Sequence, residues 1–333
     1  MTAEPDSPPS HHRPGGSFRN PWPGIEAHGL GDLLRWQKDR IHGTPADPPR
    51  SSFVRATPHF PVPRSGPDDL FATWVGHSTV LLQLGAMNVL TDPIWSERAS
   101  PLSRIGPKRW VEPGVEMGRL PPLDLVLLSH NHYDHLDEPT VRRLAKLHPA
   151  ARWVAPLGLA SRLQSWGVSR AAELDWWQSL HIAGATITCT PAQHFSARGL
   201  RDRNRTLWCG YAVRAGSHRV FFAGDTGYHP EFGRIGAQLG PFDLALIPIG
   251  AYAPRWFMRS VHMDPDEAVS AYTDVRTGHP TSHPAMLPIH WGTFKLTDEP
   301  MDEPPLRLRA AWHHAALDPA KLWLLEHGET RKA

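Results

Sequence analysis

The residues best suited to perform chemistry lie in one short segment, His130–His135, which follows the pattern H-x-H-x-D-H. Imidazole nitrogens and carboxylate oxygens are ligands that zinc takes from proteins. The alternate spacing lets His130 and His132 point one way while Asp134 and His135 reach a second centre. One short loop can therefore supply ligands to two metal ions.

The position of this segment favours a built site over a chance cluster of histidines. The chain has 21 histidines among 333 residues, and random placement gives the pattern in roughly half a percent of such sequences. The segment follows the apolar run Leu125–Leu128, which predicts a buried strand. A loop at a strand end is where a rigid scaffold presents chemical groups. A surface loop that merely contains histidines is the disfavoured alternative.

Three further candidate ligands, His194, Asp225 and His290, each follow a predicted strand. Taken singly, each would more often be a hydrogen-bonded structural residue. Taken with the H-x-H-x-D-H segment, they complete the number of ligands that two metals require, and a carboxylate can bridge both metals with its two oxygens. The predicted arrangement is one pocket of His130, His132 and His194, a second pocket of Asp134, His135 and His290, and Asp225 between them.

The composition narrows the class of protein. The formal net charge is +2, which gives no general attraction to nucleic acid, so no nucleic-acid partner is expected. No apolar run approaches the length of a transmembrane helix, and the N-terminus lacks the pattern of a secretory signal. A cytoplasmic protein is therefore expected. Cys189 and Cys209 lie in separate predicted strands; free buried thiols are the favoured interpretation, and a disulfide stays open.

The chain divides into three predicted parts. Residues 1–17 contain Pro-Pro and Gly-Gly pairs and are expected to be a disordered tail, with His11 and His12 as tail residues and not ligands. Residues 18–67 are expected to be an irregular arm with one short helix around Leu30–Trp36. The hydrolase domain is expected to occupy residues 68–333.

Apolar runs and helical patterns alternate through this third part. Asp264 is a predicted N-cap, because Pro265 and Glu267 take the first and third positions of the following helix. The order of elements predicts two sheets packed face to face with helices outside, an α/β sandwich of four layers. Expected strands cover 72–75, 80–84, 88–91, 124–129, 153–154, 186–190, 207–213, 220–222, 244–247 and 286–289, and expected helices cover 140–147, 157–166, 264–275 and 304–317.

The H-x-H-x-D-H segment with a later His, Asp and His resembles the metallo-β-lactamase superfamily. A larger part of the chain, from Phe18 to about Gly328, resembles one branch of it, the N-acyl-phosphatidylethanolamine-hydrolysing phospholipase D family. The segments that carry this resemblance are Asn20–Pro23, Thr73–Thr79, Leu90–Ile94, Gly106–Arg109, Ser129–Asp137, Glu173–Trp177, Phe221–Tyr228, Ile247–Tyr252, Pro254–Met258 and Ile289–Phe294.

The resemblance implies an αββα sandwich of two mixed sheets with outer helices, two Zn²⁺ per chain and the same seven metal ligands. It also implies that Asp134 and His262 are catalytic, with His262 as a proton donor or a phosphate ligand. The loop 277–284 is longer than its counterpart in the family. Its histidines, His279 and His283, are expected to be inserted loop residues and not ligands.

The implied reaction is hydrolysis of a phospholipid on the headgroup side of phosphorus. A hydroxide that bridges two zinc ions would attack phosphorus and release phosphatidate and an N-acylethanolamine or a similar alcohol. Asp92 is either the hydrogen-bond partner of a metal-bound histidine or a turn residue before Pro93. The alternative hydrolases are a lactonase and a soluble phosphodiesterase. A di-iron redox enzyme and a non-catalytic binding protein are the alternatives from other classes.

Large apolar side chains in predicted loops suggest contact with a lipid surface. Aromatic side chains suit an interface, and neighbouring cations could meet anionic headgroups. We therefore expect a phospholipid substrate and peripheral contact with the inner face of the membrane, and the sequence also allows a homodimer. Packing of these side chains in the core stays open as the alternative. The residues are Trp22, Trp36, Trp95, Trp110, Tyr252, Trp256, Phe257 and Met258, with Lys108, Arg109, Arg255 and Arg259 beside them.

Overall fold

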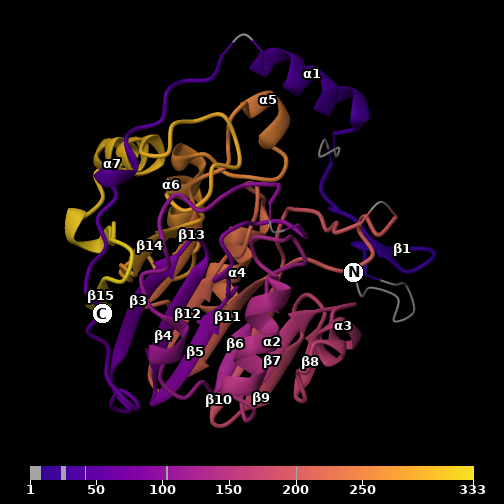
Figure 1. Cartoon of the computed structure of the whole chain (residues 1–333). Coiled ribbons are helices and arrows are strands. Elements are labelled where there is room, and N and C mark those ends of the chain that lie inside the picture. The colour runs from indigo at the N-terminus through magenta and orange to yellow at the C-terminus, as the bar shows by residue number, and fades with distance from the viewer. Residues whose placement is uncertain (1–8, 24–27, 42, 103, 200) are drawn as a thin grey trace, which may run out of the picture.

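Two mixed β-sheets pack face to face in the centre of the computed structural model, which describes residues 9–23, 28–41, 43–102, 104–199 and 201–333 (Figure 1). The seven-stranded sheet contains, in spatial order, β15 (Thr330–Lys332), β3 (Leu70–Gly76), β4 (Thr79–Leu84), β5 (Met87–Thr91), β6 (Leu125–Leu127), β7 (Arg152–Pro156) and β8 (Ala171–Leu174). The six-stranded sheet contains β14 (Ala285–Ile289), β13 (Leu244–Pro248), β12 (His218–Phe222), β11 (Gly210–Ala215), β10 (Ala185–Thr190) and β9 (Ser179–Ile182).

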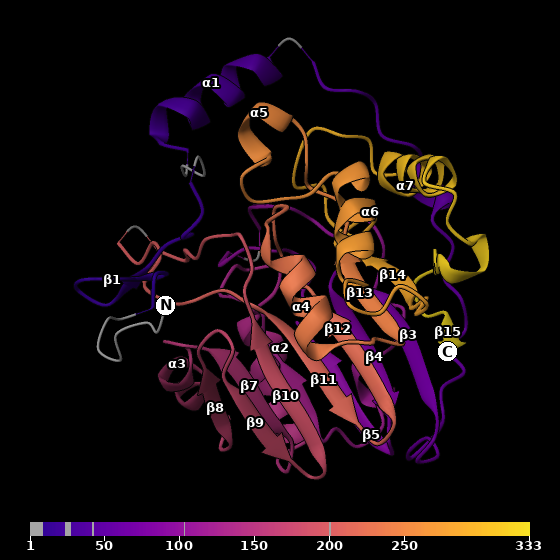
Figure 2. The ribbon, with the colours of Figure 1, turned by 180° about the vertical axis from the view of Figure 1, so that it is seen from behind.

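Helices cover the outer face of each sheet, so the expected four-layer α/β sandwich is confirmed (Figures 1 and 2). Apolar side chains of α2 (Glu138–Leu147) and α3 (Ala160–Ser165) pack on the seven-stranded sheet. Those of α4 (Glu231–Leu239), α6 (Pro265–Asp274) and α7 (Glu303–His314) pack on the six-stranded sheet. Asp264 caps α6 as predicted, because its side chain accepts a hydrogen bond from the backbone N–H of Glu267 at 2.9 Å.

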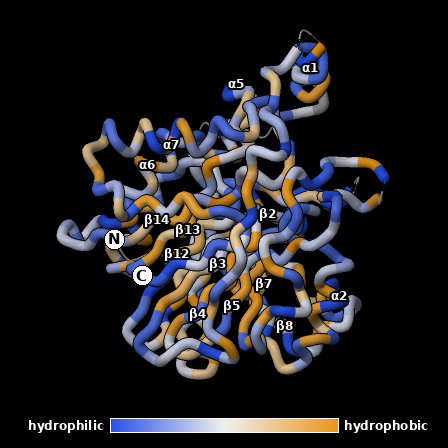
Figure 3. The backbone as a smooth tube through the Cα atoms, turned by 60° about the vertical axis from the view of Figure 1, so that its left-hand side comes forward, coloured by the Kyte–Doolittle hydropathy of each residue, from blue (hydrophilic) through white to orange (hydrophobic). Residues whose placement is uncertain are grey.

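The core between the sheets consists mainly of strand side chains, joined by loop residues such as Trp176, Leu207 and Trp208, and the strands there are largely coloured hydrophobic in Figure 3. Every residue of β4 and β5 is buried, as expected for strands covered on both faces. Cys189 and Cys209 are free, buried thiols within this core. The rigid sandwich leaves the strand-end loops along one edge as the place for chemistry.

Several elements were not expected from the sequence, and α4 shows why. Its segment contains Gly233 and Gly236, which weaken a helical pattern. A Cβ at Gly236 would lie 2.5 Å from the carbonyl oxygen of Val275, so the glycine permits close contact between α4 and the end of α6. The expected helix 157–166 begins later, at Ala160, because Gly158 has a φ of +92° and lies against Thr206.

The described part of the expected tail, residues 9–17, differs from a disordered segment. His12–Arg13 (β1) pairs with Ser17–Phe18 (β2) in a hairpin. His11 Nε2 lies 2.7 Å from one oxygen of Asp175, and His12 Nε2 lies 2.8 Å from the other. The hairpin is thus held by a residue 164 positions away in sequence. Residues 1–8 of the expected tail lie outside the described residues.

The expected arm contains the predicted helix as α1 (Leu30–Arg40), which lies above α5 (Arg255–Met258) at the top of Figure 1. The indole N–H of Trp36 donates to Asp298 at 2.6 Å, and Arg40 pairs with the other oxygen of Asp298 at 3.1 Å. These contacts fasten the arm to the loop that follows β14. Short 3₁₀ helices occur at Arg50–Ser52, Met117–Arg119 and Pro319–Lys321.

Candidate metal centre

Four strand ends bring all seven predicted ligands together at one edge of the sandwich. The H-x-H-x-D-H segment follows β6, His194 follows β10, Asp225 follows β12 and His290 directly follows β14. Apart from Asp134, whose side chain is 13% exposed, and His132, which is half-buried, the ligands are buried. The two histidines of the loop 277–284 lie elsewhere: the backbone N–H of His279 donates to the carbonyl of Arg276 at 2.9 Å, and the His283 ring contacts the Arg276 guanidinium.

His130, His132 and His194 form the first of the two predicted pockets. Nε2 of His130 lies 2.9 Å from Nδ1 of His132, which lies 3.2 Å from Nε2 of His194. Ligand atoms around a tetrahedral zinc ion are separated by about 3.3 Å. Burial is the main cause that lowers the pKa of His132 to about 3, and these imidazoles are therefore neutral and have a lone pair to offer at neutral pH.

Asp134, His135 and His290 form the second predicted pocket, with Asp225 beside it. Oδ2 of Asp134 lies 3.3 Å from Nε2 of both His135 and His290. Oδ2 of Asp225 lies 3.1 Å from Nε2 of His135 and 3.0 Å from Nε2 of His290. The same Asp225 oxygen is 3.9 Å from Nε2 of His194 in the first pocket. Asp225 therefore stands between the two groups, as the sequence predicts.

The electrostatics of the second pocket fit a bound cation. Burial alone would lower the pKa of His290, but the carboxylates of Asp225 and Asp134 raise it to about 9. The same carboxylates, with Asp92, hold the pKa of His135 well above its usual value against the effect of burial. Oδ1 of Asp225 is buried without a hydrogen-bond partner among the described residues, and Nε2 of His135 faces two carboxylate oxygens without a well-aligned hydrogen bond to either. Clustered buried carboxylates require positive charge nearby, and metal ions would supply it at these atoms.

Asp92 supports the ligands from behind, which resolves its two interpretations in favour of a hydrogen-bond partner. Its Oδ2 accepts from Nδ1 of His135 at 2.7 Å, and its Oδ1 accepts from the backbone N–H of Ser129 at 2.7 Å. The Ser129 hydroxyl lies 2.8 Å from Nδ1 of His130. Such contacts fix the tautomer and the orientation of a ligand ring.

His77 is a site residue that the sequence reasoning missed. Its Nε2 lies 2.9 Å from Oδ2 of Asp134, and its ring centroid is 4.1 Å from that of His290. The side chain is 1% exposed and follows β3, and the backbone has a φ of +56°. Its backbone N–H donates to Thr293 at 2.7 Å. The signal available in the sequence was its position just after the expected strand 72–75, like that of His194 and His290 after theirs.

His262 lies beside the centre, outside the two predicted pockets, and it forms a further possible ligand group with His194 and Asp225. Its Nδ1 is 4.0 Å from Oδ2 of Asp225, and its ring stacks on that of His290 at 5.2 Å. Arg255 donates to the backbone carbonyl of His262 at 2.8 Å while it pairs with Glu267 at 2.6 Å. Burial holds the pKa of His262 well below its usual value, so the imidazole is neutral at pH 7.

A cavity of about 820 Å³ opens onto this centre. Its polar part includes His132, Asp134, Asp225 and His262. Its other walls are largely apolar and come from α1, α5 and the loops after β10 and β14, through Leu33, Trp36, Phe195, Phe257, Met258, Val261 and Leu296. The cavity can therefore admit a molecule with one polar, reactive group and an apolar remainder.

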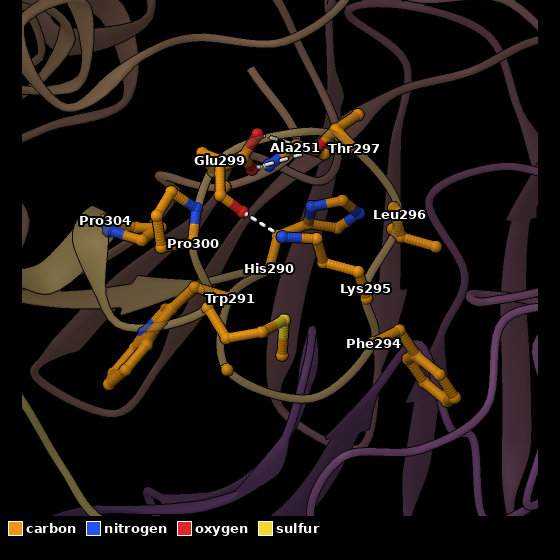
Figure 4. A pocket seen from close by; sticks show the side chains of 13 residues that line it. Ala251, His290, Trp291, Phe294, Lys295, Leu296, Thr297, Glu299, Pro300 and Pro304 are labelled. Carbon is orange, nitrogen blue, oxygen red and sulfur yellow. Dashed lines mark hydrogen bonds between the residues drawn. The ribbon is translucent and has the colours of Figure 1, made fainter. Parts of the chain in front are cut away.

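A separate small pocket lies against His290 on the side lined by Lys295 and Glu299 (Figure 4). Its volume is about 20 Å³, which is enough for about one water molecule. Glu299 accepts from the backbone N–H groups of Ala251 at 2.7 Å and Ala253 at 3.0 Å, and it also accepts from Thr297. This carboxylate shapes the loop that supplies Ala251 to the wall of the larger cavity.

Comparison with known proteins agrees with this geometry. Residues 87–291 match the model of the β-lactamase superfamily domain. The chain is 46% identical over 251 residues to N-acyl-phosphatidylethanolamine-hydrolyzing phospholipase D 1 of Caenorhabditis elegans, covering 72% of this chain and 69% of that protein. It is also 46% identical over 281 residues to an uncharacterised protein of Mycobacterium tuberculosis, covering 84% of this chain and 73% of that protein.

Solved structures show the same fold. The metallo hydrolase Igni18 of Ignicoccus hospitalis superposes with a TM-score of 0.58 at 22% identity. The match covers 80% of this chain and 98% of that one. At this identity the likeness concerns the fold.

Proposed function

This chain belongs to the β-lactamase superfamily and, within it, to the N-acyl-phosphatidylethanolamine-hydrolysing phospholipase D family, and from that membership we propose its substrate, metals and reaction. It is a metal-dependent hydrolase with the metallo-β-lactamase fold. The proposed activity is a two-zinc phosphodiesterase that cleaves an N-acyl-phosphatidylethanolamine or a similar glycerophospholipid on the headgroup side of phosphorus. The products are phosphatidate and an N-acylethanolamine or similar alcohol.

The observation that carries this proposal is the cavity that joins the metal centre to apolar walls. A phosphodiester needs cationic and hydrogen-bonding groups around phosphorus, and acyl chains need apolar surface. The lining of the 820 Å³ cavity combines carboxylates that would hold the cationic metals, Asp134 and Asp225, with a hydrogen-bonding imidazole, His262, and with apolar side chains such as Phe195 and Phe257. A small, wholly polar substrate would leave these walls without a partner.

Two zinc ions bound at the seven ligands would supply Lewis acidity and a more acidic water molecule. The side chains of the chain then have distinct roles. Asp225 stands between the two groups of ligands and holds their spacing. Asp134 is held on Oδ2 by His77 and His290, which orients its other oxygen.

His262 acts on the substrate in this scheme. Because its imidazole is neutral, its ring N–H serves as a hydrogen-bond donor to a phosphoryl or leaving-group oxygen rather than as a pre-formed imidazolium acid. Burial lowers its pKa despite the opposing effect of Asp225. Arg255, which donates to the backbone carbonyl of His262, positions the residue without reaching the cavity centre itself.

The residues exposed on the protein surface proposed to face the membrane are only some of those expected from the sequence. Trp36, Tyr252 and Met258 are buried, and Arg109 is buried with its guanidinium donating to backbone carbonyls, so these residues do not face outward. The Tyr252 hydroxyl donates to Glu303 at 2.6 Å, and the Trp36 indole N–H donates to Asp298.

Exposed apolar and basic side chains, including the expected Trp256 and Arg259, lie around α1 and α5, next to the cavity that opens onto the metal centre. Leu34 is 70% exposed, Ile41 81% and Trp256 37%. Arg35 lies 4.5 Å over the Trp256 ring, and the Arg259 side chain is 77% exposed. In the described residues no helix is long and apolar enough to span a bilayer. We propose peripheral membrane contact through this surface; an inner-face, cytoplasmic location and a homodimer remain predictions.

A substrate panel tests the proposal. Purified, zinc-loaded protein would be assayed with N-acyl-phosphatidylethanolamine, phosphatidylethanolamine, bis-p-nitrophenyl phosphate and a lactone. We expect the largest kcat/KM with the N-acylated lipid. Fast lactone hydrolysis without lipid turnover would favour the lactonase, and turnover of the soluble diester alone would favour a soluble phosphodiesterase. Metal analysis of protein purified without added metal distinguishes zinc from the di-iron alternative.

A further inference from the structure

A second large cavity, of about 620 Å³, lies beside the metal-binding loop and shares no lining residue with the catalytic cavity. It is bounded by the segment after β5, the start of α2, α3 and Arg198. Tyr133, inside the H-x-H-x-D-H segment, forms part of its wall. Nothing in the proposed reaction uses this cavity.

Two of the three acidic side chains that line this cavity are paired with cations, and the third is hydrogen-bonded. Glu97 pairs with Lys108 at 2.7 Å, and Glu138 pairs with Arg142 at 2.8 Å. Asp137 is buried and accepts hydrogen bonds from the Ser96 hydroxyl and from Thr140. The negative charge of the lining is therefore engaged by partners around the cavity.

Three arginines of the lining have no carboxylate partner within ion-pair distance among the described residues: Arg98, Arg162 and Arg198. Arg98 donates to the carbonyl of Gly106 at 2.7 Å, and Arg198 donates through Nη1 to the carbonyls of Asn131 and Leu136. Within the described chain, the Arg162 guanidinium makes no hydrogen bond to a protein group. Unpaired guanidinium groups with free N–H donors remain at the cavity.

Arg162 and Arg198 are placed as a pair. Both guanidinium groups lie over the ring of Trp166, at 5.8 Å and 5.5 Å from its centroid. Arg198 also lies 3.9 Å over the ring of Tyr133. Aromatic faces stabilise a guanidinium and fix its plane, so the two donor groups are oriented before a ligand arrives.

We propose that this cavity binds a phosphate group through Arg162 and Arg198, with Arg98 as a third contact, separately from the metal centre. Planar guanidinium groups bind phosphate oxygens with two parallel hydrogen bonds, which favours phosphate over a monovalent anion such as chloride. Leu102, which is 55% exposed, and Pro101 form an apolar part of the lining. A phosphate carried on a lipid or free in solution has the chemistry that the cavity recognises.

Isothermal titration of the metal-loaded protein with inorganic phosphate tests the proposal. Phosphate should also bind at the metals, but equally in every variant, so this binding does not affect the comparison between variants. Arg162→Gln removes one clamp residue that makes no protein hydrogen bond, whereas Arg198 also holds the metal loop and is left intact. We expect Arg162→Gln to raise the Kd of phosphate at the site in this cavity about tenfold. Arg98→Gln should raise the Kd at the same site. Arg143→Gln, which removes an equal charge from an exposed position on α2 outside the cavity, should match the wild type.

Two further arms distinguish the sources of phosphate. Phosphatidylcholine vesicles with and without phosphatidate would be sedimented with each variant. Loss of phosphatidate-dependent binding in Arg162→Gln supports a lipid headgroup as the ligand, and unchanged sedimentation with weakened inorganic phosphate binding supports a free phosphate. Identical phosphate isotherms for wild type and Arg162→Gln, with circular dichroism showing both folded, would overturn the proposal.

Discussion

Replacement of His77 by Asn would isolate the hydrogen bond that holds Asp134. His77 has a φ of +56°, a conformation that Asn tolerates better than most residues, so the backbone need not move. The shorter Asn side chain does not reach Oδ2 of Asp134, which His77 contacts at 2.9 Å. The substitution therefore removes one contact to a proposed metal ligand and leaves all seven ligands in place.

The size of the expected loss in metal affinity follows from the environment of the hydrogen bond between His77 and Asp134. The His77 side chain is 1% exposed, and its acceptor is a carboxylate whose pKa lies well below its usual value. Burial alone would raise that pKa, but the charge of His135 and the hydrogen bonds of its neighbours outweigh burial. A hydrogen bond to a charged group contributes about 1.5–3 kcal/mol. Loss of support for a metal ligand weakens metal affinity roughly 10- to 100-fold.

The assay is a chelator competition that reports each metal separately, alongside kcat. We expect His77→Asn to retain the metal of the first pocket, at His130, His132 and His194. The metal of the second pocket, which includes Asp134, should bind about 10- to 100-fold more weakly. His229→Asn is the matched control, because His229 is buried, stacks on Trp22 and has no side-chain hydrogen-bond partner among the described residues. Unchanged affinity of both metals in His77→Asn would refute the role given to His77. Equal loss of both metals would point to general unfolding instead.

Three further outcomes are expected. Asp225→Asn should fold but lose metal and turnover; two metals and normal activity in that variant would remove Asp225 as the bridge. His262→Ala should retain both metals and lose at least about 100-fold in kcat, whereas loss of one metal would make His262 a ligand. Asp175→Asn should destabilise the protein by about 1–3 kcal/mol in urea titrations at pH 6. Although burial raises the pKa of Asp175, hydrogen bonds from His11 and neighbours lower it below 3.8, so the wild-type advantage should be full above pH 3.8 and shrink as the pH falls through the lower folded pKa. An advantage that grows in acid would contradict this reasoning.

The metal centre could be predicted from the sequence because four of its ligands are neighbours in the chain. Spacing alone predicts a metal-binding segment at His130, His132, Asp134 and His135. The remaining three ligands each follow an apolar strand. Strand-end positions converge in a sandwich of this kind, which is why isolated residues could be assigned to one site. Their convergence in the structure agrees with that reasoning, while their metals remain a proposal.

The parts that sequence reasoning missed depend on contacts between distant segments. His77 lies 57 positions from Asp134, and they become partners because the loops after β3 and β6 meet at one edge of the sandwich. The hairpin of residues 12–18 depends on Asp175. Packing decides which of the aromatic residues expected to contact lipid are exposed: Trp36 and Tyr252 are buried, and Trp256 is exposed. Residue type alone does not tell these cases apart.

Hydrolysis of N-acyl-phosphatidylethanolamine in ¹⁸O-labelled water tests the central claim most directly, because it reports which bond breaks. Attack of water on phosphorus with loss of the headgroup alcohol should place the label in the phosphate group of phosphatidate and leave the N-acylethanolamine unlabelled. Mass spectrometry of both products would measure this. Label in the alcohol, or diacylglycerol as the lipid product, would contradict the proposed reaction.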